Sequence, residues 1–460
     1  MAPPTFKLEF QESGPGYRVR VEGPDGAGEY PIHGCDQADY ASFFLAVAKD
    51  HGTRVPHAFA PALDFPAADG RWRPLLTDNV SPTILSGYGD PAVLKTAGGY
   101  VLVATSNDAP DAFPILQSHD LSHWRHQGFV FPDGKQPGWT AQGTRVADFW
   151  APEMVPAGDE YWLCYTARQK NNALAIGMAR SNHPAGPWTD LGRPLLTGPQ
   201  LQTTAGQAPV PSGVIDPHIF VDVDDQRYLF WKGDLNGIWP RPLATLLRQH
   251  PSLIDEIFAG EADRRTAAFA AASVEWANGR RPLERFFLMQ PLIETALANW
   301  QMVKTVLRQC GLADAFVHAL ITPVFGARLA AEGDRLHGDP IVALSNDLDW
   351  EGHLIEGPFV TRQAGRYWMF YAGNDFSTPA YGIGAAVSDH PLGPYRKQPE
   401  PLLQSNREWL APGHPSVAAG PDGAPQIFFH AYRPGMVGYN SFRALLTARL
   451  RFTGDGVAID

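Results

Sequence analysis

The segment Arg366-Tyr-Trp-Met-Phe-Tyr-Ala-Gly373 is the clearest copy of a repeat that runs through most of this 460-residue chain. Each copy is a short, aromatic-rich strand that follows a turn and ends in small or polar residues. The other four copies are Gly99-Tyr-Val-Leu-Val-Ala-Thr-Ser106, Glu160-Tyr-Trp-Leu-Cys-Tyr-Thr-Ala167, Arg227-Tyr-Leu-Phe-Trp-Lys-Gly233 and Pro425-Gln-Ile-Phe-Phe-His-Ala-Tyr432. Successive copies lie roughly 60–70 residues apart, except for one interval about twice as long.

Other strand-like segments surround each copy of the repeat. Asp216-Pro-His-Ile-Phe-Val-Asp222 precedes the third copy, and Ala175-Ile-Gly-Met-Ala-Arg-Ser181 and Gly382-Ile-Gly-Ala-Ala-Val-Ser388 follow the second and fourth. Four short strands in each of five units are typical of a β-propeller. The repeat therefore predicts an all-β fold, a five-bladed β-propeller.

The long interval lies in the third unit and has a different composition. Between residues 238 and 322 apolar residues recur with helical spacing, for example from Leu292 to Leu307. Pro291 can begin this last helix and Gly311 can end it. We therefore predict a helical insertion at 238–322, between the second and third strands of blade three.

The first part of the chain lacks the repeat. Phe6–Phe10 and Tyr17–Val21 alternate like the strands of a hairpin, and 41–48 has the pattern of a helix. Residues 1–75 therefore predict a small α+β appendage, which leaves 76–460 as the propeller domain.

Composition excludes several kinds of partner. The net charge is −11 and there is no basic run, which argues against nucleic acid and suits a neutral small substrate. The three cysteines (Cys35, Cys164 and Cys310) lack the spacing of a zinc site or a disulfide framework. No apolar run approaches the ~18 residues of a membrane span. The N-terminus lacks the pattern of a secretory signal, so the sequence predicts a cytoplasmic protein.

Three carboxylates stand in similar contexts at the starts of three blades. Asp90 lies in Gly-Asp-Pro before blade one, Asp216 in Ile-Asp-Pro before blade three, and Glu356 in Glu-Gly-Pro before blade four. We expect the three acids to share one register on the innermost strands and to converge on a central pocket. Asp339, in another Asp-Pro, lies late in its unit and is expected to form an ordinary turn.

A cluster of carboxylates suits the hydrolysis of glycosidic bonds. One carboxylic acid protonates the leaving oxygen while a carboxylate activates water or attacks the sugar carbon. Clustered acids also raise one another's pKa, which keeps a general acid protonated near neutral pH.

Five motifs in order resemble those of glycoside hydrolase family 43. They are Gly-Asp90-Pro, Trp150-Ala-Pro-Glu, Ile-Asp216-Pro-His-Ile-Phe, Glu356-Gly-Pro and Gly-His414-Pro-Ser-Val. The resemblance covers about 80–235 and 323–455. It implies an inverting hydrolase in which Asp90 is the general base, Glu356 the general acid and Asp216 the group that orients the acid and tunes its pKa. An inverting enzyme separates its base and acid by about 6.5–9.5 Å to leave room for water.

The same resemblance suggests further site residues. Trp150 would lie beside the sugar, Arg443 near the substrate, and His414 near the propeller axis, where it would contact the substrate or a cation through water. No cofactor is expected for the chemistry, although a structural Ca²⁺ or Na⁺ on the axis is consistent with the family. From the strand directions, the loops that carry Asn107 and Phe376 are expected on the pocket face as substrate contacts.

The resulting hypothesis is a hydrolase that releases a pentose, L-arabinofuranose or D-xylose, from oligosaccharides. Alternatives are an endo-acting arabinanase and a carbohydrate-binding propeller without catalysis. A retaining, fructosidase-type propeller is disfavoured because such enzymes carry Glu-Cys-Pro where this chain has Glu356-Gly-Pro. The insertion at 238–322 is expected to border the pocket or to form a homo-oligomer contact.

Overall fold

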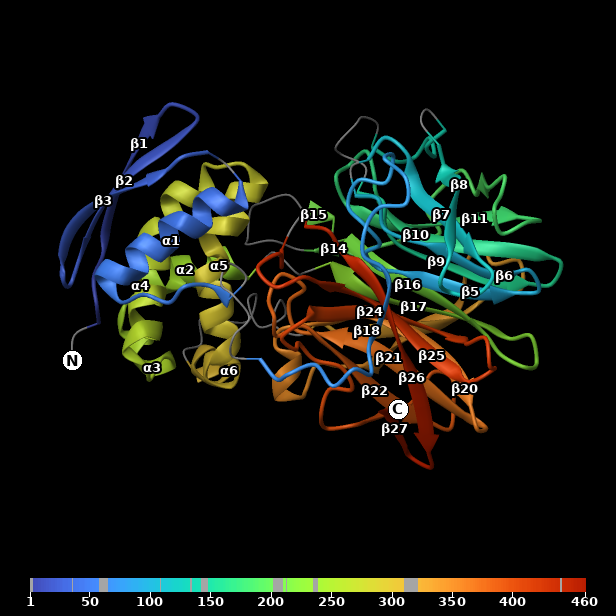
Figure 1. Cartoon of the computed structure of the whole chain (residues 1–460). Helices are drawn as coiled ribbons and strands as arrows, with labels where there is room; N and C mark the ends of the chain where they lie inside the picture. Colours follow the sequence, from blue (N-terminus) through green and yellow to red (C-terminus); the bar gives the residue numbers. More distant parts are fainter. Residues whose placement is uncertain are drawn as a thin grey trace. The chain divides into compact units, whose positions relative to one another are not determined.

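The structure of the chain is a computed structural model, which describes residues 3–34, 36–57, 65–107, 109–132, 135–141, 148–201, 210–211, 213–234, 239–309, 322–438 and 441–460. The chain divides into two compact units, each of which is built from segments distant in sequence (Figure 1). The larger unit comprises Asp64–Leu235, Thr322–Arg433 and Asn440–Asp460. The smaller unit comprises Met1–Leu63, Asn236–Ile321 and Pro434–Tyr439.

The larger unit contains five antiparallel sheets of four or five strands among its described residues. The first sheet consists of β5 (Ala92–Thr96), β6 (Gly99–Val103), β7 (Ala112–Ser118) and β8 (Trp124–Phe131). The second consists of β9 (Trp150–Ala157), β10 (Glu160–Arg168), β11 (Leu174–Ser181), β12 (Thr189–Asp190) and β13 (Leu196–Thr197). A short ribbon of β14 (Gln200–Leu201) and β15 (Val210–Pro211) follows.

The remaining three sheets repeat the same order of strands. The third sheet consists of β16 (Gly213–Val221), β17 (Arg227–Asp234), β18 (Val324–Leu329) and β19 (Leu336–Leu344). The fourth consists of β20 (Ile355–Gln363), β21 (Arg366–Gly373), β22 (Gly382–Ser388) and β23 (Arg396–Lys397). The fifth consists of β24 (Leu410–Ala419), β25 (Pro425–Tyr432), β26 (Ala444–Thr453) and β27 (Gly456–Ile459), and β4 (Arg73–Leu76) pairs with β26.

The five sheets follow one another in a cyclic order of contacts. The first strands touch in the sequence β5, β9, β16, β20, β24 and back to β5. A separate apolar core fills each of the five gaps between neighbouring sheets. The first strand of each sheet therefore contacts the first strand of the next, which lets residues on these strands share one site.

The five predicted repeat strands are present as β6, β10, β17, β21 and β25, the second strand of each sheet. Their aromatic residues suit this place because the second strand lies between two others and packs against adjacent sheets on both faces. In β21, for example, every residue after Arg366 is buried. Asp339 does not form the expected turn. It lies within the outer strand β19, where its side chain is exposed.

The smaller unit combines strands from the N-terminus with helices from the middle of the chain. It contains the meander β1 (Lys7–Ser13), β2 (Gly16–Gly23) and β3 (Gly26–Ile32), followed by α1 (Gln37–His51). Among the residues that the structure describes, its other helices lie between β17 and β18 in sequence: α2 (Pro240–Gln249), α3 (Ser252–Ile257), α4 (Glu261–Asn278), α5 (Pro282–Ala298) and α6 (Trp300–Gln309). One hydrophobic core joins both groups. Residues 1–63 and 236–321 thus share a fold, although the sequence suggests two separate parts.

Local signals explain the helix ends in this unit. Asp36 caps α1 by accepting a hydrogen bond from the Asp39 N–H, and Gly52 ends the helix in the left-handed conformation (φ 62°). The predicted start at Pro291 is wrong, because Pro291 lies inside α5. Pro282 occupies the first turn instead, where a missing N–H costs nothing. Gly311, the predicted end, lies outside the described residues.

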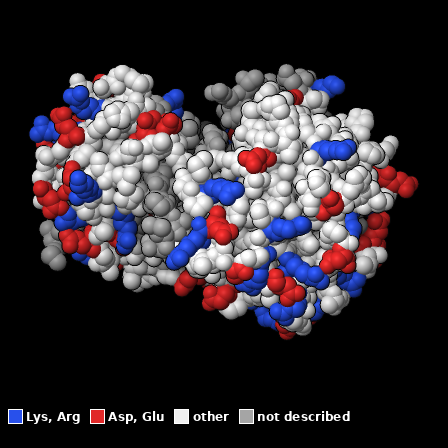
Figure 2. Space-filling view, in the orientation of Figure 1, with Lys and Arg blue, Asp and Glu red and all other residues white. Residues whose placement is uncertain are grey.

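On the face shown in Figure 2, acidic and basic side chains are interspersed. Within the described part of the chain, no helix is both long enough and apolar enough to cross a membrane.

Candidate active site

Five residues with left-handed backbone mark the starts of the five sheets. Asp90, Ala151, Asp216, Gly357 and His414 have φ angles from 46° to 56°, and each directly precedes a proline. This conformation is unfavourable for residues other than glycine and costs about 1–3 kcal/mol. Such strain is characteristic of functional sites, where the surrounding structure holds a side chain in a set direction. The left-handed residue and the proline after it therefore occupy the same register in all five sheets.

Aligned on these prolines, the three carboxylates do not share one register. Asp90 and Asp216 occupy the left-handed position, whereas Glu356 lies one residue before it. The prediction of a common register is therefore wrong for Glu356. The reason is that Gly357 takes the left-handed conformation in the fourth sheet, which glycine adopts without a steric penalty. A break in the strand register follows directly, between Glu356 and Phe359.

Side chains from one sheet hold the left-handed residues of the next. The Ala151 N–H donates to Thr105 Oγ1 (2.8 Å), and the Asp216 N–H donates to Thr166 Oγ1 (3.1 Å). The Gly357 N–H donates to Asp216 Oδ2 (3.0 Å). These bonds satisfy backbone groups that the distorted strands leave unpaired.

Asp90 is surrounded by cationic and hydrogen-bonding groups. Arg443 Nη1 donates to Asp90 Oδ1 (2.9 Å), and Thr105 Oγ1 donates to Oδ2 (2.5 Å). The Nδ1 atoms of His414 and His430 both lie 3.5 Å from Oδ1. Burial raises the pKa of Asp90, but these partners outweigh it, so the pKa falls well below its usual value. Asp90 is therefore ionised at neutral pH.

Asp216 interacts electrostatically with both of the other acids. Burial raises its pKa to about 6; His414 and Lys232 oppose this rise, and the charges of Glu356 and Asp90 add to it. Its bond from the Gly357 N–H ties it to the residue next to Glu356. Asp216 thus contacts the backbone next to Glu356, and the charges of both other acids raise its pKa.

Glu356 is held by two buried side chains that the sequence analysis missed. Lys232 Nζ lies 3.1 Å from Glu356 Oε2, and the Tyr381 hydroxyl donates to Oε1 (2.7 Å). Lys232 is fully buried. Its position in an otherwise aromatic strand, Arg227-Tyr-Leu-Phe-Trp-Lys-Gly233, is the signal that could have revealed it. His430 in β25 is a similar signal, since polar groups are rare in such strands.

The other predicted site residues are placed as follows. His414 and Arg443 reach Asp90, as described above. Trp150 opens β9 at the position that Glu356 has in β20, and its buried Nε1 has no hydrogen-bond partner among the described residues. Asn107 is left-handed and its carbonyl accepts from the Phe149 N–H (3.2 Å). Phe376 is half-buried beside Asp375, an acid whose pKa burial raises to about 6.

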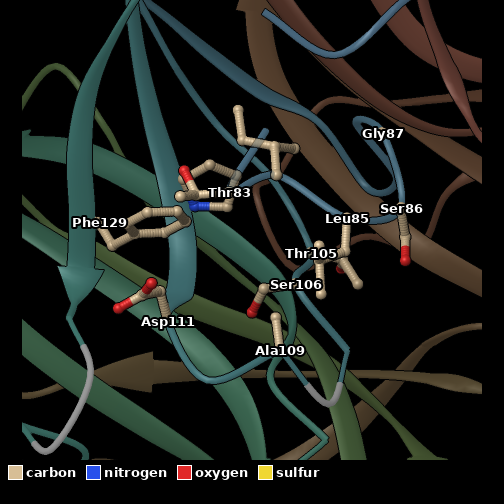
Figure 3. A pocket seen from close by; sticks show the side chains of 11 residues that line it. Thr83, Leu85, Ser86, Gly87, Thr105, Ser106, Ala109, Asp111 and Phe129 are labelled. Atoms are coloured by element: carbon tan, nitrogen blue, oxygen red, sulfur yellow. The ribbon is translucent and has the colours of Figure 1, made fainter. Parts of the chain in front are cut away.

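A small pocket lies beside the residues that support Asp90 (Figure 3). Thr105 and Gly87 both line this pocket. Thr105 donates a hydrogen bond to Asp90, and Gly87 forms a β-bridge with Arg443. Its remaining lining combines hydroxyl groups with apolar side chains such as Phe129 and the exposed Leu85. Its volume of about 10 Å³ is close to that of a single water molecule and far below that of a sugar.

The sequence profile of glycosyl hydrolases family 43 matches residues 80–254 and 321–458. The chain belongs to this family. The matched residues include all three carboxylates and the two histidines that face Asp90.

Curated relatives match parts of the chain. An arabinoxylan arabinofuranohydrolase of Bacillus subtilis is 29% identical over 134 residues, which are 27% of this chain and 24% of that protein. A probable arabinan endo-1,5-α-L-arabinosidase B of Aspergillus fumigatus is 36% identical over 161 residues, which are 34% of this chain and 40% of that protein. The chain thus spans less than half the length of these two relatives.

Solved structures support the family fold. A thermostable family-43 glycoside hydrolase superposes with a TM-score of 0.56 at 24% identity, covering 82% of this chain and 93% of that one. An endo-arabinase from Bacteroides thetaiotaomicron gives a TM-score of 0.50 at 17% identity, covering 85% and 99%.

The residues around Asp90 bear on the predicted cation. The described residues contain no group of three or more His, Cys, Asp or Glu side chains arranged to hold a metal ion directly. The place beside Asp90 is taken by the buried Arg443 guanidinium, which repels cations. Direct coordination at His414 therefore does not fit these residues, and contact with a cation through water stays a prediction.

One glycine is a sensitive point of this site. A Cβ atom on Gly413 would lie 1.7 Å from Cε1 of Tyr381, whereas Gly138 has open space around it. We expect Gly413→Ala to displace Tyr381 from Glu356, to lower the free energy of unfolding by about 1–3 kcal/mol and to reduce activity. Urea denaturation and initial rates would measure both effects. Gly138→Ala is the matched control, and equal behaviour of the two variants would contradict the assigned packing.

Proposed function

We propose that this protein is an inverting glycoside hydrolase that releases a pentose, L-arabinofuranose or D-xylose, from oligosaccharides. The observation that carries the proposal is the grouping of three acids in different environments. Asp90 is ionised by contact with Arg443, Asp216 has a pKa of about 6, and Glu356 lies between Lys232 and Tyr381. Acids whose environments separate their pKa values are typical of paired acid and base catalysis.

The environments suggest the roles of the three acids. Asp90, the acid with the strongly lowered pKa, suits the base that deprotonates the attacking water. Glu356 suits the acid that protonates the leaving oxygen. Asp216 suits the group that orients Glu356, because it accepts a hydrogen bond from the adjacent Gly357 N–H. Inversion requires water between Asp90 and the sugar carbon, on the side opposite to Glu356.

The proposal includes the finer architecture. The cyclic contacts of β5, β9, β16, β20 and β24 support a five-bladed β-propeller, with the acids at the starts of the innermost strands. The helices between β17 and β18 support an insertion in blade three. A cation bound through water near His414 and a homo-oligomer contact through 238–322 belong to the same proposal and have no support beyond the sequence.

The choice of sugar rests on relatives. Names of similar proteins include arabinoxylan arabinofuranohydrolase, arabinan endo-1,5-α-L-arabinosidase B and xylosidase/arabinosidase 43A. Arabinose or xylose is therefore the favoured product. The names of the endo-acting relatives make internal cleavage of the arabinan polysaccharide the second candidate function.

A substrate panel tests the proposal. Purified protein is incubated with 4-nitrophenyl α-L-arabinofuranoside, 4-nitrophenyl β-D-xyloside, arabino-oligosaccharides and linear arabinan, and NMR follows the anomer of the first product. Release of a monosaccharide with inverted configuration is expected. Oligosaccharide products from arabinan would favour endo-action. Binding of oligosaccharides with no hydrolysis would instead favour a carbohydrate-binding propeller.

A further inference from the structure

The contacts of Glu356 carry an inference that rests on the proposed function. Lys232 lies on β17 of the third sheet, whereas Glu356 lies on β20 of the fourth, so their contact crosses between sheets. The Tyr381 hydroxyl approaches the other carboxylate oxygen from the segment before β22. Each oxygen of Glu356 therefore receives a hydrogen bond, which limits rotation of the carboxyl group.

We propose that Lys232 is a positioning residue that, together with Tyr381, holds the Glu356 carboxyl group toward the leaving oxygen and sets the upper pH limit of activity. Lys232 is fully buried, so its charge is not screened by solvent. A general acid must carry its proton when substrate binds. The positive charge of Lys232 lies 3.1 Å from Glu356 Oε2 and attracts a carboxylate but not a neutral carboxyl group.

Other charged groups face Glu356 and act in the opposite direction. Asp216 on β16, Asp234 at the end of β17 and Asp375 after β21 each interact with the charge of Glu356. Like charges favour the protonated form of an acid. Lys232 in turn lowers the pKa of each of these three carboxyl groups against the effect of burial. It is thus a shared counter-charge for four acids.

Tyr381 and His353 complete these surroundings. Burial and the charge of Glu356 hold the pKa of Tyr381 well above its usual value, so its hydroxyl remains a donor. Burial and the charge of Lys232 lower the pKa of His353 to about 3, so this ring is neutral. His414 on β24 packs against the adjacent Gly357. Among the groups described around Glu356, Lys232 is the cation in direct contact with it.

A second cluster in the same unit provides a matched control. Lys397 Nζ lies 2.6 Å from Glu351 Oε1, and the Tyr371 hydroxyl donates to the same carboxylate (2.8 Å). Both the glutamate and the lysine are largely buried. The residue types match those around Glu356, but Glu351 also accepts the backbone N–H groups of Asp347 and Leu348, as a structural carboxylate does.

The test is the pH profile of kcat/KM on the pentoside that the wild type hydrolyses. Lys232→Met keeps the length of the side chain and removes its charge. We expect the alkaline limb to move upward by about 1–3 pH units and kcat to fall more than KM changes. Lys397→Met is expected to lower the unfolding temperature and to leave the alkaline limb in place. An unchanged limb in Lys232→Met would overturn the inference.

Tyr381→Phe keeps the test decisive if Lys232→Met does not fold. It removes one hydrogen bond to ionised Glu356 without an added volume, so the alkaline limb should rise by about one to two units. If the alkaline limb of this variant stays in place, the joint role of the two residues is overturned. Glu356→Ala separates the proposed function from the role of Lys232. If it retains wild-type activity, the proposed function fails; if it is inactive while the limb stays fixed in both other variants, only the role of Lys232 fails.

Discussion

Replacing Asp90 by asparagine is expected to reduce kcat/KM by about 10²–10⁴-fold, the usual contribution of a general base. The amide has nearly the shape of the carboxylate: its oxygen can still accept from Arg443, and its NH2 group can donate to the Thr105 hydroxyl. It cannot take a proton from water, so the loss should appear in kcat rather than in KM. Initial rates over a range of substrate concentrations would measure the effect.

Stability must be measured beside the activity of Asp90→Asn, because the change leaves the buried Arg443 without a counter-charge. Asp339→Asn is the control. Asp339 also precedes a proline, but its side chain is exposed on the outer strand β19. This control should retain wild-type rates and stability. An Asp90→Asn enzyme that folds and keeps more than about a tenth of wild-type activity would contradict a general-base role.

The sequence predicts the scaffold better than the details of the site. The aromatic repeat identifies all five second strands, because burial on both faces makes these strands largely apolar. It also identifies the starts of the sheets, where Asp90, Asp216 and Glu356 lie. The one-residue offset of Glu356 becomes visible only when the motifs are aligned on the proline that follows each left-handed residue.

The partners of the acids could not be predicted in the same way. Lys232 and Tyr381 are distant in sequence from Glu356, and only the packing of neighbouring sheets brings them together. His430 likewise reaches Asp90 from the fifth sheet, across the contact between β24 and β5. The shared core of residues 1–63 and 236–321 has the same cause, because apolar helix faces indicate burial but not the surface that covers them.

The second large effect is expected for Glu356→Gln, and its size should depend on the leaving group. A general acid matters most when the departing oxygen is a poor leaving group, as in an oligosaccharide. We expect kcat on the oligosaccharide to fall by about 10²–10⁴-fold. A 2,4-dinitrophenyl glycoside of the same sugar, whose leaving group needs no proton, should be affected far less. Parallel rates on the two substrates would measure the difference.

Glu351→Gln separates this chemistry from a loss of stability. Both glutamates are buried and contact a lysine and a tyrosine, so both variants remove a charge from a similar cluster. Lys397 keeps Asp347 as a partner at 2.7 Å, and Lys232 keeps the nearby acids Asp216, Asp234 and Asp375, so both variants should cost some stability. Neither cost distinguishes one substrate from another, because unfolding lowers all rates equally. A leaving-group dependence confined to Glu356→Gln therefore identifies Glu356 as the proton donor, and a uniform loss on both substrates would contradict that role.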